Sequence, residues 1–118
     1  MAYVRKHILK RPNTETAFPE IKSYNSDYWD WRRQYYSDNN ITVTYDLSGD
    51  ELTLTQEMSM SDKSVWDAFN TADDARGDYA SIKGSLNTAF ADRNITIQIE
   101  EDDDGTGATL LTETNTLP

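Results

Sequence analysis

Apolar and polar residues alternate most clearly in one stretch of the chain, Ile41–Met58, which reads ITVTYDLSGDELTLTQEM. The alternation has a period of two residues on both sides of a short turn that contains Gly49. Such a pattern predicts a β-hairpin with one apolar face. The rest of the chain must cover that face.

Two further strands are predicted at the two ends of the patterned region. Residues 2–10 (AYVRKHILK) predict a first strand, which Pro12 ends because proline lacks the backbone donor that a sheet ladder needs. Residues 95–99 (ITIQI) predict a last strand with three isoleucines on one face. Between the first strand and the next element, the proline- and asparagine-containing residues 12–25 predict a loop.

Two helical regions are predicted between these strands. Residues 26–36 (SDYWDWRRQYY) predict a short helix with Ser26 as its N-cap. Residues 62–92 carry apolar side chains at steps of three and four, as an amphipathic helix does, with Ser59 or Ser61 as its cap. Gly77 interrupts this second region, which therefore predicts either a bend or two helices.

A short pattern occurs twice where a helix is expected to lead into a strand. Residues 36–43 read YSDNNITV, and residues 90–97 read FADRNITI. Asn40 and Asn94 occupy the same place in both copies, and asparagine tolerates the left-handed conformation that ends a helix. Either a duplication or the shared chemistry of the junction explains the pattern.

The predicted element order is β-α-β-β-α-β, the split-βαβ or ferredoxin-like arrangement of an α+β protein. Its usual strand order, 4-1-3-2, places the first and third of four strands side by side in a mainly antiparallel sheet. A plain antiparallel sheet with the hairpin in the middle is the competing topology, and both give a two-layer sandwich. We expect residues 1–100 to form one domain and residues 101–118 an acidic C-terminal tail or arm. The anchors of such an arm are Leu110, Leu111 and Leu117.

The charge of the chain is strongly negative and uneven. The net charge is −10, with about +3 on residues 1–33 and about −13 on the rest. Such a chain repels nucleic acid, so we expect no nucleic-acid partner. No apolar run is long enough for a membrane span, and we expect no membrane contact. The absence of cysteine and the single histidine, His7, argue against thiolate and multi-histidine metal sites.

The first helix carries the most distinctive surface in the sequence. One face is expected to enter the core, and the other combines aromatic rings with arginines, which suits stacking against bases, sugars or another protein's side chains. The alternative is that the aromatic residues cap the edge of the sheet while the arginines extend to solvent. The expected core face holds Tyr28, Trp31 and Tyr35, and the expected protein-binding face holds Trp29, Arg32, Arg33 and Tyr36.

No catalytic residue, cofactor or metal site is predicted. Residues 102–113 (DDDGTGATLLTE) fit a twelve-residue calcium loop only in part, because Thr106 stands where Asp or Asn is usual. Three carboxylates near Gly77, those of Asp73, Asp74 and Asp78, are expected to be solvated rather than metal-bound.

Several short segments together resemble small uncharacterised proteins of large tailed phages from marine hosts. These segments are the opening YVRKHILKRPN, the tryptophan-containing helix, the ELTLT strand and the NIT strand, within residues 3–99. The resemblance implies an accessory or virion component and carries no catalytic residues over. It implies a location in a virion or in the host cytoplasm.

Three functions follow from these observations. The leading one is a non-enzymatic structural or interaction protein of a phage virion or its assembly, which self-associates or docks on a larger particle. The second is an acidic decoy that imitates a phosphate backbone and inhibits a nucleic-acid-binding enzyme, for which Asp73, Asp74 and Asp78 would be needed. The third is a small-ligand or enzymatic domain with a cleft around Tyr3, His7, Tyr45 and Tyr79, by analogy with the fold alone.

Overall fold

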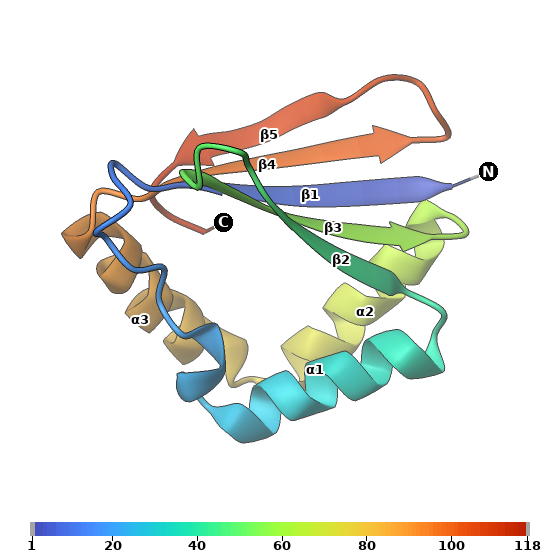
Figure 1. The fold of residues 1–118 in the computed structure, drawn as a ribbon. Coiled ribbons are helices and arrows are strands. Elements are labelled where there is room, and N and C mark those ends of the chain that lie inside the picture. Colours follow the sequence, from blue (N-terminus) through green and yellow to red (C-terminus); the bar gives the residue numbers. More distant parts are fainter. Residues whose placement is uncertain (1, 118) are drawn as a thin grey trace.

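The chain folds as an α+β protein with one five-stranded antiparallel sheet and three α-helices. The computed structural model describes residues 2–117. Figure 1 shows the sheet above and the three helices below it, so the helices cover one face of the sheet. The opposite face of the sheet carries no helix among the described residues.

The strands run in the order β2-β3-β1-β4-β5, and every neighbouring pair is antiparallel. The predicted adjacency of the first and third strands is confirmed, because β1 pairs with β3 along its whole length. The prediction of four strands in the order 4-1-3-2 is wrong as a complete description, because a fifth strand lies beyond β4. The strands are β1 (Tyr3–Lys10), β2 (Thr42–Leu47), β3 (Thr53–Met60), β4 (Thr96–Asp103) and β5 (Thr109–Thr114).

The predicted C-terminal arm is instead part of the sheet. β4 continues to Asp103, and the chain turns back to pair β5 with it. The turn is built from left-handed residues, Asp104 at φ 58°, Gly105 at φ 70° and Gly107 at φ 101°, and glycine adopts that conformation without strain. The prediction missed the hairpin because its second strand has two adjacent leucines rather than an alternating pattern. Pro118, the last residue of the predicted arm, lies outside the described residues.

After β5 the chain returns to the helical side of the sheet. The backbone N–H of Leu117 donates a hydrogen bond to the Asn87 side-chain oxygen at 2.5 Å, and the Asn87 amide donates to the Leu117 carbonyl at 3.4 Å. Leu117 also packs against the core. This anchor holds the C-terminal end of the described chain against the third helix.

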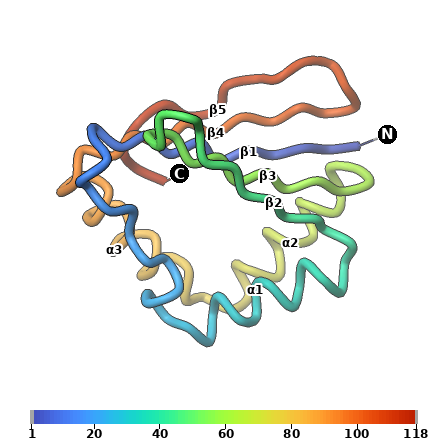
Figure 2. Tube along the Cα trace, in the orientation of Figure 1, coloured from blue at the N-terminus to red at the C-terminus, as the bar shows by residue number. Residues whose placement is uncertain are grey.

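The helices are α1 (Ser26–Asp38), α2 (Lys63–Arg76) and α3 (Tyr79–Asp92), with a short 3₁₀ helix at Ile21–Ser23. Two separate helices follow β3. Of the two predicted alternatives, a bent helix or two helices, the second is therefore confirmed. The break falls at Gly77, which ends α2 in the left-handed conformation at φ 79°. Figure 2 traces this break and the loop that leads from β1 down to α1.

The helix caps differ from those predicted. Asn25, not Ser26, caps α1, and its side chain accepts a hydrogen bond from the Tyr28 N–H at 3.2 Å. Asp62, rather than a preceding serine, caps α2 by accepting from the Ser64 N–H at 2.8 Å. Both caps satisfy an N–H that has no partner within the helix.

The two copies of the repeated pattern form the same junction. Asn40 and Asn94 are left-handed, at φ 55° and φ 53°. In each copy the next residue is a buried isoleucine whose N–H donates back to the helix, from Ile41 to the Tyr36 carbonyl at 2.9 Å and from Ile95 to the Phe90 carbonyl at 3.0 Å. Both junctions therefore end a helix in the same way, with a left-handed asparagine, as the sequence predicts.

The core between sheet and helices divides into two apolar clusters. One lies under β4 and is made mainly by α3, and the other lies under β3 and is made mainly by α1 and α2. The first contains Leu9, Tyr28, Ile82, Leu86, Phe90, Ile95, Ile97 and Ile99, and the second contains Tyr3, Tyr36, Ile41, Met58, Met60, Trp66 and Phe69. The site described below lies where the two clusters meet.

Replacement of either junction asparagine tests this account. We expect Asn40→Ala and Asn94→Ala each to lower the free energy of unfolding by about 1 kcal/mol, because alanine is strained at positive φ. Asn40→Gly and Asn94→Gly are expected to cost less. Urea unfolding measures all four variants, with Asn70→Ala on the exposed face of α2 as the control. Equal costs at all three asparagines would contradict the left-handed role.

Candidate functional site

The buried face of α1 has an arginine at its centre. Tyr28, Arg32 and Tyr36 follow steps of four and are the three buried residues of this helix. Arg32 is 7% exposed, and it donates hydrogen bonds to the Tyr36 hydroxyl through Nε and to the Tyr28 hydroxyl through Nη1 at 3.1 Å. The prediction that Arg32 and Tyr36 belong to an exposed protein-binding face is therefore wrong.

Aromatic rings surround this buried guanidinium. The Arg32 Cζ atom lies 4.8 Å from the Phe69 ring centroid, 5.2 Å from that of Trp29 and 5.7 Å from that of Tyr79. The negative faces of aromatic rings attract a cation at such distances. Burial lowers the pKa of Arg32, but the surrounding tyrosines outweigh this effect and raise it above the ordinary value, so the group is charged.

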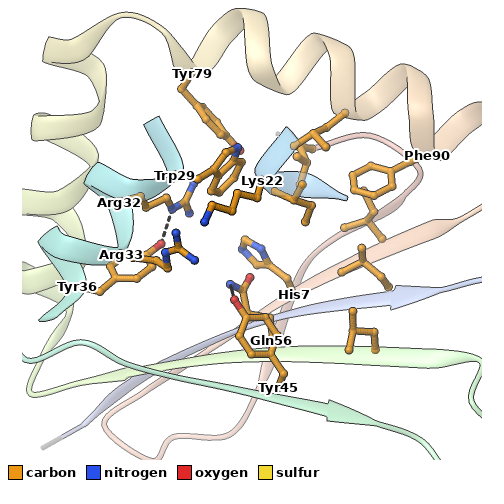
Figure 3. A pocket seen from close by; sticks show the side chains of 16 residues that line it. His7, Lys22, Trp29, Arg32, Arg33, Tyr36, Tyr45, Gln56, Tyr79 and Phe90 are labelled. Carbon is orange, nitrogen blue, oxygen red and sulfur yellow. Dashed lines mark hydrogen bonds between the residues drawn. The ribbon is translucent and has the colours of Figure 1, made fainter. Parts of the chain in front are cut away.

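A cavity of about 180 Å³ lies between the sheet and the helices, beside Arg32. Residues of both core clusters line it, together with polar groups from β1, β2 and β3. In Figure 3 the nitrogen-bearing ends of Lys22, Arg32 and Arg33 point toward one part of the cavity, near His7, while Phe90 lies at the other side. The cavity therefore has a cationic end and an apolar end.

The charges around the cavity are nearly all positive. None of the described residues that line it is an aspartate or a glutamate, although the chain has 21 acidic residues. Outside the lining, exposed Asp30 forms ion pairs with Arg33 and, at 3.7 Å, with Lys22, and the buried carboxyl group of Asp73 interacts electrostatically with Arg32. No carboxylate among residues 2–117 forms an ion pair with Arg32.

His7 points from the central strand β1 into this cationic environment. Burial in the protein interior, followed by the charges of Arg32 and Arg5, lowers its pKa from 6.5 to about 3. His7 is therefore neutral at ordinary pH. Beside it, the Gln56 amide donates a hydrogen bond to the Tyr45 hydroxyl at 3.3 Å, which adds two polar groups from β3 and β2.

The carboxylates near Gly77 do not form a common patch. Asp73 is buried, and burial raises the pKa of its carboxyl group. Asp78 pairs with Arg76 at 2.9 Å. The exposed acidic patch that the decoy hypothesis requires is thus not assembled from these residues.

The partial calcium pattern forms a hairpin turn. The Asp102 side chain accepts a hydrogen bond from the Gly107 N–H at 3.2 Å, whereas Glu113 lies on β5 opposite Gln98. Among residues 2–117, no group of three or more histidine, aspartate or glutamate side chains is arranged to hold a metal ion. Within the same residues, no helix has the length and apolar character needed to cross a bilayer.

The sheet offers a second candidate site at its two edges. Among residues 2–117, the exposed large apolar side chains all lie on the two edge strands, Tyr45 at 67% and Leu47 at 46% on β2, and Leu110 at 49% and Leu111 at 43% on β5. Each edge strand pairs on one side only. The edges therefore present apolar side chains together with backbone groups that lack a strand partner.

The structure separates the residues predicted for one interface. Arg32 and Tyr36 are buried beside the cavity, Trp29 and Arg33 line it, and Leu117 packs on the core. Of the residues predicted for this interface, Leu110 and Leu111 are the two exposed apolar ones. The cleft that the third hypothesis places around His7, Tyr45 and Tyr79 does contain these three residues, whereas Tyr3 lies outside it and donates a hydrogen bond to Glu101 at 2.7 Å.

The sequence reasoning missed Lys22 and Gln56 as parts of the cavity. Lys22 lies in the loop before α1, and a loop lysine gives no signal of its place in the fold. Gln56 had a signal, because it occupies the inward phase of β3 between Leu54 and Met58, where an apolar residue is expected.

No protein-family model, curated protein or solved structure matches this chain. The functional conclusions therefore rest on the cavity and the sheet edges themselves.

The depressed pKa of His7 predicts how stability depends on pH. Protonation of His7 is less favourable in the folded state than in the unfolded chain. The stability that neutral His7 contributes is therefore fully present above pH 6.5 and is lost as the pH falls toward 3. Between about pH 7 and about pH 5, we expect the wild-type free energy of unfolding to fall by about 1–2 kcal/mol more than that of His7→Gln. Urea unfolding at both pH values measures this. Parallel pH dependence in the two proteins would contradict the assignment.

Proposed function

We propose that this protein is a non-enzymatic structural and interaction protein that self-associates through the edges of its sheet. The observation that carries the proposal is the placement of Tyr45, Leu47, Leu110 and Leu111, whose exposed apolar side chains all lie on edge strands. Scattered apolar residues on a surface need no explanation, but their concentration on two strands that each have one unpaired edge favours pairing with another strand.

The composition of the edge strands supports the same proposal. Proteins usually protect an exposed edge with lysine, proline or a strongly twisting bulge. The sequences of β2 (TVTYDL) and β5 (TLLTET) contain neither lysine nor proline, and each holds one acidic residue. The β5 edge carries a bulge, because Leu111 has no partner opposite it between Thr112 and Leu110, whereas the register of the β2 edge with β3 is unbroken. We therefore expect a second copy of the chain to extend the sheet.

The resemblance to small proteins of large tailed phages provides the biological setting of the proposal. A virion or assembly component repeats many times in one particle, and edge pairing suits such repetition. The proposed partners are other copies of this chain or neighbouring virion proteins, in the virion or the host cytoplasm.

We also propose that the fold is a two-layer, ferredoxin-like sandwich with an added strand. Two features support this relation. The first four strands follow a β-α-β-β-α-β order in which α2 and α3 together form the second helical connection. In the sheet, β4, β1, β3 and β2 are consecutive, and β5 extends this set at its β4 edge.

Light scattering after size exclusion tests self-association. We expect the wild-type protein to show a mass above that of one chain, rising with concentration. Tyr45→Lys/Leu47→Lys on β2 and Leu110→Lys/Leu111→Lys on β5 each replace the two exposed apolar side chains of one edge with lysine, the residue that protects sheet edges in other proteins. The matched control, Ser81→Lys/Ser85→Lys on the exposed face of α3, is expected to behave as wild type.

The same variants distinguish the three ways of pairing. If β2 pairs with β5, each edge variant alone stops growth and an equal mixture of the two forms only a heterodimer. If β5 pairs with β5, only the β5 variant dissociates, and if β2 pairs with β2, only the β2 variant dissociates. A single-chain mass for the wild type at every concentration would contradict self-association. Deletion of residues 101–118 is a poor test, because it removes the end of β4 as well as β5.

A further inference from the structure

We propose that the cavity beside Arg32 binds a small organic carboxylate with an apolar body, held with its carboxylate at the cationic end. This site is separate from the sheet edges, and the proposal does not depend on self-association. Four observations lead to it, concerning charge, unused hydrogen-bond donors, the apolar lining and size.

The charge around the cavity selects an anion. Lys22, Arg32 and Arg33 reach one end of it, and among residues 2–117 the only carboxylate that forms an ion pair with any of these cations is that of Asp30, outside the lining. The buried carboxyl group of Asp73, which interacts with Arg32, does not line the cavity either. The same positive environment acts on His7, whose pKa is lowered by burial and then by Arg32 and Arg5. The positive charges that disfavour protonation of His7 would attract an anion bound beside it.

Arg32 also has N–H groups that can donate hydrogen bonds to a ligand. An arginine has five N–H donors, and those of Arg32 make hydrogen bonds to two tyrosine hydroxyls through Nε and Nη1. The Tyr79 hydroxyl also interacts with the guanidinium. Among the described residues, no other hydrogen bond of normal geometry uses Nη2 or the second N–H of Nη1. These groups form the fork that binds a carboxylate with two parallel hydrogen bonds. The aromatic rings around the guanidinium fix its position before a ligand arrives.

The other end of the cavity selects an apolar body. Leu9, Leu86, Phe90 and Ile97 line it, and all four belong to the apolar cluster under β4. This combination of an apolar wall with a few convergent polar groups is typical of small-molecule sites. A free inorganic anion would leave the apolar end unfilled.

The size of the cavity limits the ligand. Its volume of about 180 Å³ exceeds the roughly 150 Å³ of an engineered apolar cavity that binds benzene. One aromatic ring or a short aliphatic chain with one carboxylate therefore fits, and a nucleotide does not. Entry is available from the side of Lys22, Arg33 and Tyr45, whose side chains are exposed.

Isothermal titration with three probes tests the proposal. Benzoate combines the ring with the charge, benzyl alcohol keeps the ring without the charge, and acetate keeps the charge without the ring. We expect benzoate to bind, with an affinity roughly tenfold or more above that of either other probe, because each lacks one half of the recognition. Absence of benzoate binding, or equal binding of benzoate and benzyl alcohol, would overturn the proposal. Equal binding of benzoate and acetate would overturn the apolar half and show an adventitious ion only.

Variants at the mouth of the cavity locate the bound probe without disturbing the core. Lys22→Gln and Arg33→Gln each remove one exposed cation that lines the cavity, and each is expected to weaken benzoate binding several-fold. Lys83→Gln removes the same charge from α3, away from the lining, and is expected to leave binding unchanged. Leu54→Phe narrows the cavity without changing charge and is expected to abolish binding. An equal effect of Lys83→Gln and Lys22→Gln would mean that net charge alone attracts the probe, and would overturn the site.

Discussion

The buried charge of Arg32 is the constraint on which the interior of this protein depends. Removing a guanidinium from water is costly unless hydrogen bonds and favourable electrostatics compensate for it. The compensation comes from all sides, from Tyr28 and Tyr36 on the same helix, from Phe69 on α2 and from Tyr79 on α3. All three helices thus contribute side chains to the surroundings of one cation.

This constraint also explains why the apolar core is divided. A continuous core of isoleucine, leucine and phenylalanine would leave Arg32 without polar partners. The cluster under β4 and the cluster under β3 instead stand on either side of a polar seam that contains Arg32, His7 and Gln56. The cavity is part of this seam, so a polar group within it has partners on several elements.

Tyr45 connects the cavity with the edge of the sheet. Its hydroxyl accepts a hydrogen bond from Gln56, its ring lines the cavity, and it lies on the edge strand β2 with most of its surface exposed. A strand added to β2 would change the surroundings of this ring. Occupation of the cavity and pairing at this edge therefore share one side chain, and each has a physical route to affect the other.

The features that local chemistry determines were predictable from the sequence. The hairpin follows from its alternation, the break at Gly77 from the conformational freedom of glycine, and the two junctions from asparagine before a buried isoleucine. The burial of Arg32 was not predictable in this way, because an arginine beside Trp29 on an amphipathic helix is usually exposed. Its position depends on aromatic residues more than 35 positions away in the sequence, such as Phe69. The fifth strand was missed for a similar reason, since its pairing with β4 and not its own pattern makes it a strand.

The topology of the sheet sets the order in which the protein can fold during synthesis. β1 is made first but lies in the centre, where it pairs with β3 on one side and with β4 on the other. A hydrogen bond between Tyr3 and Glu101 joins residues 98 positions apart. The hairpin of β2 and β3 can form early, whereas one side of β1 has no partner until β4 has been synthesised. In the nascent chain β1 therefore has no partner until β3 has been made, and it is paired on one side only until β4 follows. Contacts so distant in sequence slow the final closure of the sheet.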